Sequence, residues 1–276
     1  FSMRTRRFEQ LRPSEIIAER NRCPVIYLPI GPLEWHSLHL PFGTDAFHAQ
    51  IVAEKAAEQS GGVVHPVLYW GTERERTPEF LGFLGFEEDE YVVGMDHPAN
   101  SLKSLYCREE YFSLLVRELI DRLMQLDYKM IVIVNGHGGP NHVAVLDRLC
   151  REFNETTDVK VLVAHVCSPP SPIRGHHLAH ADTIETSIVM ATHPDCVDLT
   201  QLPPPDEPLS IPDLAILDYP TALGQPTVDH TVHPENDPRV YATPDLGQEV
   251  INLGAKRVAE TVQRMLKEGR HVPRTN

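Results

Sequence analysis

The sequence lacks the features that mark secreted, membrane-spanning and nucleic-acid-binding proteins. Cysteine occurs only 5 times in 276 residues, an odd count without a Cys-x-x-Cys pair, which favours free thiols in a reducing compartment. No apolar run reaches the length of about 18 residues that a transmembrane helix needs, and no secretory signal is visible. Basic residues are scarce, since 25 Lys and Arg face 39 Asp and Glu for a net charge of −14. We therefore expect a cytoplasmic protein that binds neither membranes nor nucleic acids, whose phosphates attract clustered Lys and Arg.

The remaining composition is that of an ordinary globular protein, with 41% hydrophobic and 23% charged residues, and it allows a large buried core. Setting aside Phe1 and Ser2, which precede the first Met, we expect residues 3–276 to form a single domain.

Apolar runs alternate with amphipathic stretches along the chain. This alternation predicts an α/β fold with a mostly parallel central sheet and helices on both faces. We expect strands over residues 23–31, 63–70, 129–134 and 159–167. We expect helices over residues 44–62, 108–127, 141–153, 181–193 and 245–269.

Two segments show no clear period. Residues 71–107 carry scattered Gly, Pro and charged residues and are interpreted as a long loop insertion, a kind of segment that is usually functional in compact domains. Residues 203–244 hold 10 of the 24 prolines, which predicts irregular structure.

Three clusters of polar side chains each follow a predicted strand. Their members are Glu34, His36, His39 and Asp45, then Asn135 and His137, then His176, His177, His180, Asp182 and Glu185. Ligands of parallel sheets bind beyond the carboxyl ends of the strands, so we expect the three clusters to meet at one edge of the sheet.

Carboxylates and imidazoles in one place suit zinc, manganese or iron better than calcium or magnesium. With two or more of each, two metal ions become possible, and one carboxylate would bridge them. The residues also have simpler explanations. Any one His can lie on the surface, the turn after residue 134 can be only a strand end, and Asp182 with Glu185 can be the acidic first turn of a helix.

The same three segments resemble the motifs of the creatininase (creatinine amidohydrolase) family. Residues 31–45 resemble the pattern Gly-x-x-Glu-Gln-His-Gly-x-His-Leu-Pro-x-x-Thr-Asp. Residues 135–139 resemble Asn-Gly-His-Gly-Gly, and residues 180–187 resemble His-Ala-Gly-x-x-Glu-Thr-Ser. With a further similarity in DPRVYATPDLGQEVI, the resemblance runs from about residue 24 to residue 262.

The resemblance implies a parallel α/β fold, a centre of two divalent ions (Zn, Mn or Fe) per chain, and a homo-oligomer, which in this family is often a hexamer. Carried over by position, the implied metal ligands are Glu34, His36, Asp45, His137 and Glu185. Asp45 would bridge the two ions, and His180 would transfer protons beside them, so that His180 and Glu185 are the expected catalytic residues. Some relatives take the last carboxylate from two residues after the second motif's His. That position is Gly139 here, which makes Glu185 the natural substitute.

This sequence departs from the family pattern at several positions without losing a ligand. Trp35, Ser37 and Leu38 replace Gln, Gly and Pro, Pro140 follows Gly139, and Asp182 stands where the third motif has Gly. Trp35 is expected either to line the substrate site or only to pack. Asp182 is expected either to contact substrate or to cap a helix.

The resemblance implies a hydrolase in which a metal-bound hydroxide attacks a carbonyl carbon and His180 protonates the leaving nitrogen. Metal binding lowers the pKa of water from about 15.7 to about 7, so this nucleophile exists at neutral pH. The expected reaction is cleavage of a C–N amide bond in a small, polar, cyclic substrate.

Three alternatives stay open: a formamide hydrolase, a hydrolase that opens a cyclic diketone by C–C cleavage, and a non-catalytic metal-binding protein. The insertion at 71–107 is expected to reshape the pocket, which argues against creatinine itself as the substrate.

Overall fold

The computed structural model describes residues 3–167, 180–209 and 234–269 except 95, 97 and 99. Its sheet has the strand order β2-β1-β3-β4, and every pairing is parallel. The strands are β1 (Val25–Ile30), β2 (Val63–Val64), β3 (Met130–Asn135) and β4 (Lys160–His165). All residues of β1 and β3 are buried, as expected for central strands that are covered on both faces.

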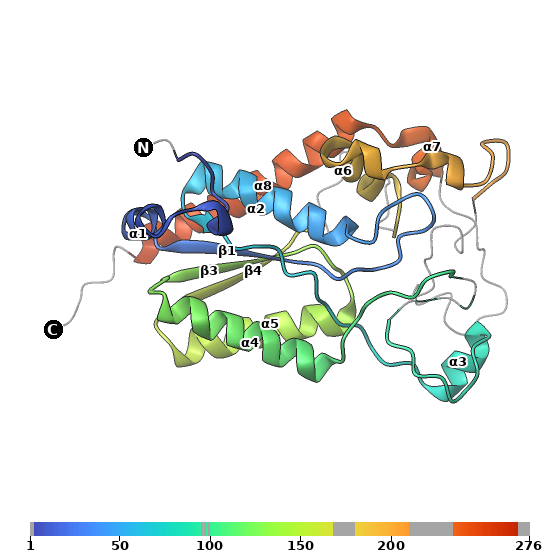
Figure 1. Cartoon of the computed structure of the whole chain (residues 1–276), viewed down its shortest axis with the longest axis horizontal. Helices are drawn as coiled ribbons and strands as arrows, with labels where there is room; N and C mark the ends of the chain where they lie inside the picture. The colour runs from blue at the N-terminus through green and yellow to red at the C-terminus, as the bar shows by residue number, and fades with distance from the viewer. Residues whose placement is uncertain are drawn as a thin grey trace.

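Helices cover both faces of this sheet, and Figure 1 shows α2, α6 and α8 on one side and α4 and α5 on the other. The α-helices are α1 (Pro13–Arg22), α2 (Thr44–Ser60), α3 (Pro78–Leu84), α4 (Glu109–Gln125), α5 (Pro140–Thr156), α6 (Thr183–Thr192), α7 (Pro238–Tyr241) and α8 (Pro244–Gly269). Short 3-10 helices are η1 (Phe8–Gln10), η2 (Pro194–Cys196), η3 (Leu199–Gln201) and η5 (Pro234–Asn236). Among the described residues, no helix combines the length and the apolar character needed to cross a bilayer.

The core consists of two apolar layers, one on each face of the sheet. Along β3, Val132 and Val134 pack with α2, α6 and α8, whereas Ile131 and Ile133 pack with α4 and α5. This alternation follows from the two-residue period of a strand. The predicted fold class, a parallel sheet between two helical layers, is therefore confirmed.

The main differences from the predicted elements lie at the edges. The strand predicted over 63–70 pairs regularly only at Val63 and Val64, with one further bridge from Leu68 to Ile30, because Pro66 has no N–H to donate in between. The insertion at 71–107 is not wholly a loop, since it contains α3, which Thr77 caps through the amide of Phe80. The helix α1 was not predicted at all.

The polar clusters meet where the parallel strands end. Beyond that edge the segment 71–107 extends away from the helical layers and carries α3 (Figure 1). It is tied back to the β1–α2 connection by a bridge between Leu33 and Leu105. The topology thus places this segment over the carboxyl edge of the sheet.

The buried carboxylate of Glu19 in α1 accepts hydrogen bonds from three segments of the chain, so its replacement tests the fold. It accepts hydrogen bonds from Arg6 at 2.5 Å, from Arg22 at 2.5 and 2.7 Å, and from the amide of Gly62 at 2.8 Å. Burial raises the pKa of Glu19, but the hydrogen bonds from Arg22 and Gly62 and the neighbouring positive charges outweigh it, so the pKa lies below its ordinary value of 4.5.

Replacing Glu19 with glutamine is expected to lower the free energy of unfolding by about 2 kcal/mol at pH 7, since the partly buried Arg6 and the more exposed Arg22 lose their buried counter-charge. The folded-state pKa is depressed, so the carboxylate stabilises the fold above the unfolded value and loses this effect as the pH falls through the folded value. Urea denaturation at pH 7 and pH 4 should therefore show a difference between wild type and Glu19→Gln that shrinks on acidification. Equal stabilities at pH 7 would contradict this.

Candidate metal centre

The expected ligands come from four places in the chain, two connections that follow strands and two first turns of helices. Glu34 and His36 lie in the connection after β1, and Asp45 lies in the first turn of α2. His137 follows β3, and Glu185 lies in the first turn of α6. Four of these side chains are at most 4% exposed, and only that of Glu185 is partly accessible, at 22%.

Gly136 makes the approach of the second motif to α2 possible. A Cβ at this position would lie 2.0 Å from the carbonyl oxygen of Asp45, far inside any normal contact. The chain after β3 can therefore touch the backbone of Asp45 only because residue 136 has no side chain. This close approach sets His137 beside the Asp45 carboxylate.

The ligand atoms form three groups of three, and within each group all atoms lie within 4.8 Å of one another. The groups are Glu34 with Asp45 and His137, His36 with Asp45 and Glu185, and Glu34 with His36 and His180. Asp45 belongs to two groups and presents a different oxygen to each. Its Oδ1 lies 3.2 Å from Nε2 of His36 and its Oδ2 lies 3.0 Å from Nδ1 of His137.

The carboxylates of Glu34 and Glu185 complete these two groups. Oε2 of Glu34 lies 3.1 Å from Nδ1 of His137, and Oε2 of Glu185 lies 3.7 Å from Nε2 of His36. The geometry is thus that of two adjacent three-ligand positions that share one carboxylate.

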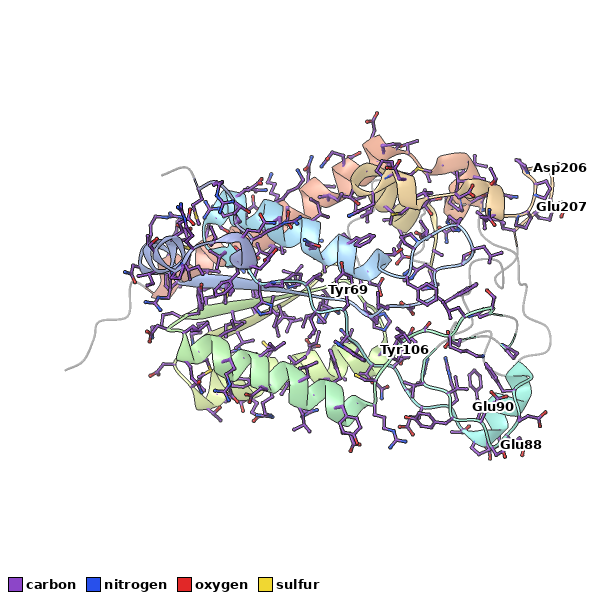
Figure 2. All side chains as sticks on the ribbon, in the orientation of Figure 1. Tyr69, Glu88, Glu90, Tyr106, Asp206 and Glu207 are labelled. Atoms are coloured by element: carbon purple, nitrogen blue, oxygen red, sulfur yellow. The ribbon has the colours of Figure 1, made fainter. Side chains whose placement is uncertain are left out.

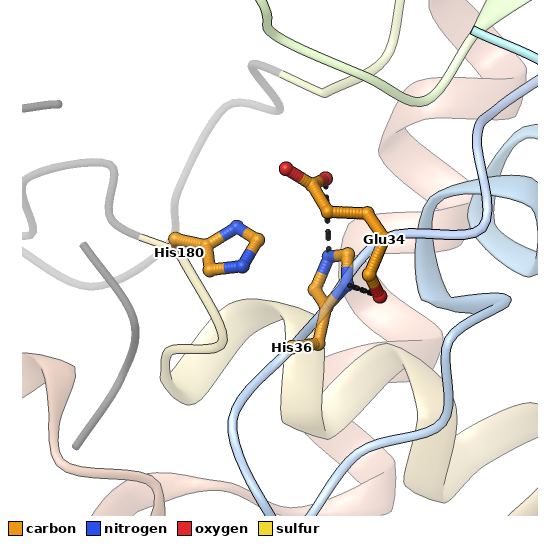
Figure 3. A group of neighbouring side chains, drawn as sticks. All are labelled: Glu34, His36 and His180. Carbon is orange, nitrogen blue, oxygen red and sulfur yellow. Dashed lines mark hydrogen bonds and ion pairs between the residues drawn. The ribbon is translucent and has the colours of Figure 1, made fainter. Parts of the chain in front are cut away.

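Backbone carbonyls fix the orientation of two imidazoles. Nδ1 of His36 donates to the carbonyl of Glu34 at 3.0 Å, and Nε2 of His180 donates to the carbonyl of Trp35 at 2.6 Å. Each carbonyl therefore fixes one nitrogen of its ring, and Nε2 of His36 is left to face Asp45. Figure 3 shows His180 facing His36, with ring centroids 4.2 Å apart.

Burial and neighbouring charges shift the pKa values of the site residues in different directions. Burial lowers the pKa of His36, but the charge and hydrogen bond of Asp45, followed by Glu185 and Glu34, outweigh it and raise the pKa to about 10. Burial opposes ionisation of Asp45 as well, yet His36 and His137 hold the pKa of Asp45 below its ordinary value. For Glu185, burial raises the pKa, and with the charges of Asp45 and Asp182 it prevails over His36, giving about 8. Burial and then His36 lower the pKa of His180, which favours the neutral imidazole at pH 7.

These observations fit a divalent metal. Three carboxylates and two imidazoles with converging atoms are the donor set of zinc, manganese or iron sites. Burial first, and then the charges of Asp45 and Asp182, favour the protonated form of Glu185, whereas a bound divalent cation would favour its ionised form.

Asp182 caps helix α6. Its buried side chain accepts hydrogen bonds from the amides of Ile184 at 2.9 Å and Glu185 at 3.1 Å, as an N-cap residue does. The carboxylate of Glu185 accepts from the amide of Ala181 at 2.5 Å. Asp182 thus holds the turn that carries Glu185, and its expected contact with substrate stays a prediction.

Trp35 packs edge-on against Phe42, with ring centroids 6.0 Å apart, and its amide donates to the hydroxyl of Ser104 at 2.9 Å. Its ring is half-buried, so both its packing role and its expected substrate role fit. Ser37 adopts φ 60, in the left-handed region, which explains why a family pattern with Gly suits this position.

Other histidines of these segments do not belong to the ligand groups of the described residues. His39 bonds the hydroxyl of Thr186 at 2.9 Å, and neither His39 nor His48 belongs to a ligand group among the described residues. His176 and His177 lie outside the described residues.

Sequence reasoning missed the part that the 71–107 segment contributes to the site. The hydroxyl of the partly buried Tyr106 donates to Oε1 of Glu34, which leaves Oε2 directed at His137. Figure 2 shows Tyr106 between the sheet and the part of the segment that carries α3. Glu73 of the same segment is also buried beside His137. Neither residue lies in a motif, so only the length of the insertion signalled a functional role.

A buried carboxylate–imidazole cluster at the carboxyl edge of a parallel sheet is typical of a metal-dependent enzyme. Comparison with known proteins names the family: the creatininase (creatinine amidohydrolase) family model matches residues 9–262. The chain belongs to this family of metal-dependent amidohydrolases, which confirms both the sequence-based assignment and the enzyme class.

Individual relatives agree with this assignment. A creatinine amidohydrolase from Pseudomonas putida is 25% identical over 263 residues, which cover 87% of this chain and 88% of the relative. A mutant creatininase of the Zn-Zn type has a TM-score of 0.66 at 21% identity, and a manganese creatininase has a TM-score of 0.65 at 20% identity. Each match covers 95% of this chain and 99% of the other, and both share the fold.

Proposed function

We propose that this protein is a hydrolase with two divalent metal ions, zinc or manganese, that cleaves a C–N amide bond in a small polar, cyclic substrate. The observation that carries the proposal is the pair of three-ligand groups that share Asp45. Glu34, Asp45 and His137 would hold one ion, and His36, Asp45 and Glu185 the other. Bound there, divalent ions lower the pKa of water toward about 7 and polarise a substrate carbonyl.

The burial of the three groups indicates the side from which the substrate approaches. Glu34, Asp45 and His137 are all buried, whereas the groups that include Glu185 and His180 each have one partly exposed member. Substrate therefore approaches from the side of Glu185 and His180. Trp35, whose carbonyl fixes His180, stands at the same side, where its ring can contact the substrate.

His180 is suited to move a proton. Its Nε2–H is held by the carbonyl of Trp35, so Nδ1 carries the lone pair, and its pKa is lowered. Nδ1 accepts the proton of the attacking water and returns it to the leaving nitrogen, as general acid–base catalysis requires.

The function is tested by loading the purified protein with zinc or manganese and assaying cyclic amides, creatinine included, formamides and cyclic diketones. We expect about two metal ions per chain and turnover of a cyclic amide other than creatinine. His180→Gln should keep the metal and lose at least about 100-fold in rate, since general acid–base catalysis contributes about 100- to 10,000-fold. His193→Gln, which changes a histidine stacked on Phe47 outside the ligand groups, is the matched control.

Other outcomes select the alternatives. Turnover only of formamides or cyclic diketones would assign one of the other two reactions to the same centre. Bound metal without turnover in any of the three substrate classes would support the non-catalytic interpretation, and efficient turnover of creatinine would refute the inference drawn from the 71–107 segment.

Removal of the metal is expected to destabilise the protein as well as inactivate it. A ligand that binds only the folded state stabilises it by an amount that grows with its concentration above the dissociation constant, about 2.7 kcal/mol at a hundredfold excess. Thermal unfolding before and after dialysis against a chelator should show a lower Tm for the metal-free protein, restored by added zinc or manganese. An unchanged Tm would count against a metal held by this cluster.

The single domain over residues 3–276, the homo-oligomer and the cytoplasmic location stay predictions of the sequence.

A further inference from the structure

Two buried polar atoms face one small space beside the metal centre. Nε2 of His137 and Oε2 of Glu73 lie 2.4 Å and 2.5 Å from the point where a Cβ on Gly139 would stand. Both residues are at most 4% exposed, and neither atom has a hydrogen-bond partner among the described residues. A donor and an acceptor thus border the same space, which is open because Gly139 has no side chain.

The other two imidazoles of the site show what is missing at His137. His36 and His180 each donate one ring N–H to a backbone carbonyl. His137 directs Nδ1 at Asp45 and Glu34, so a metal held by these carboxylates takes the lone pair of Nδ1. The hydrogen of the neutral ring is then on Nε2, and it needs an acceptor, because ligating histidines almost always donate their other N–H.

We infer that Glu73 is this acceptor and is a positioning residue of the metal centre. Oε1 of Glu73 already accepts from the amide of Arg74 at 2.8 Å, which anchors the carboxylate and leaves Oε2 for His137. The two atoms are not hydrogen-bonded to each other, so Oε2 is inferred to accept the Nε2–H through one bridging water, which can join polar groups at little cost. This inference rests on the metal site of the proposed function and extends it to the outer support of one ligand.

Tyr106 makes the inference more specific. It comes from the same 71–107 segment and donates to Glu34, which shares a metal position with His137. The segment therefore supports two of the three ligands of that position, Tyr106 acting on the carboxylate and Glu73 on the imidazole. Its role is to orient ligands as well as to shape the pocket.

The experiment measures the zinc affinity of the metal-free protein by competition with a chelator. Glu73→Ala is expected to weaken binding at one position by about 10- to 100-fold, the usual loss when the outer partner of a ligand is removed. Glu73→Gln keeps an acceptor oxygen and should recover most of the affinity. Glu75→Ala changes a glutamate two residues away whose side chain is 56% exposed, and it should bind zinc like wild type.

Gly139→Ala perturbs the same contact from the other side. Its Cβ would stand between the two atoms, whereas the φ and ψ of Gly139, −55 and 128, suit any residue, so the expected loss in affinity is steric in origin. Gly138→Ala is the control, since its Cβ would meet only Sγ of Cys167, at 3.9 Å. If both changes act through one contact, the double variant Glu73→Ala with Gly139→Ala should bind zinc no more weakly than the single variant with the lower affinity.

A second readout is the Nε2–H of His137 in the NMR spectrum of the zinc-loaded protein. It should exchange slowly in wild type and Glu73→Gln, and rapidly in Glu73→Ala. Unchanged zinc affinity in both Glu73→Ala and Gly139→Ala would overturn the inference. If Glu73→Ala does not fold, Gly139→Ala decides by comparison with Gly138→Ala, and equal zinc affinities of these two variants would overturn the inference. Because zinc affinity is measured without substrate, a failed search for hydrolysis leaves this test intact.

Discussion

Replacing Asp45 with alanine is expected to remove both metal ions at once and to lower the hydrolysis rate by more than about 1,000-fold, because metal ions supply several kcal/mol of stabilisation to the charge that develops in the reaction. Its two oxygens face His36 and His137 separately, so no other side chain completes both groups. The change also leaves Glu34 and Glu185 without the carboxylate that closes each group. Metal analysis of the purified variant should find less than one ion per chain.

Single replacements of His36 and His137 provide the comparison for Asp45→Ala. His36→Ala and His137→Ala each remove a ligand from only one of the two groups that share Asp45, so each should keep metal at the other position. Asp147→Ala is a matched control, since Asp147 bonds His165 at 2.9 Å outside every ligand group. If Asp45→Ala keeps one ion with full occupancy, Asp45 does not bridge, and the assignment of two adjacent positions is wrong.

Gly136→Ala is expected to destabilise the protein by about 3 kcal/mol and to weaken metal binding at the position of His137. The new Cβ would lie 2.0 Å from the carbonyl oxygen of Asp45 and 2.7 Å from its carbonyl carbon. These are backbone atoms at the start of a buried helix, so the turn and α2 must move apart. Overpacking in a dense interior typically costs about 1–3 kcal/mol and sometimes more.

Urea denaturation and zinc titration of Gly136→Ala check both effects. Gly138→Ala, two residues further along the same turn, has room for its Cβ and should change both quantities far less. A Gly136→Ala variant as stable as Gly138→Ala, with unchanged zinc affinity, would show that the close approach of the turn to Asp45 is not what positions His137.

The order of strands and helices could be predicted because it depends on local patterns. The apolar runs at residues 25–30 and 130–135 need two covered faces, and in the structure they form the central pair of strands. Residues 63–70 were less predictable. Their composition suits a strand, but Pro66 and the position at the sheet edge limit regular pairing to two residues. Helix α1 was missed because its ten residues carry little apolar pattern.

The candidate site was predictable where the chain itself brings ligands together. Glu34, His36 and Asp45 lie within twelve residues, and the parallel sheet brings His137 and Glu185 to the same edge. The ambiguity at Asp182 could not be settled in advance, since a capping aspartate and a substrate-binding aspartate look alike in sequence. The hydrogen bonds to the amides of Ile184 and Glu185 show the capping role.

The sequence by itself determined the fold class and the family, because apolar periodicity and motif spacing are local properties of the chain, and it predicted the candidate ligands that the structure brings together. Only the tertiary structure decided which oxygen of Asp45 faces which histidine, and that Tyr106 and Glu73 reach the site from a segment without a motif. These relations depend on contacts between residues far apart in the chain, such as Asp45 with His137 and Glu73 with His137. The absence of a side chain at Gly136 and Gly139 acquires its meaning only when the atoms that would be displaced are in place.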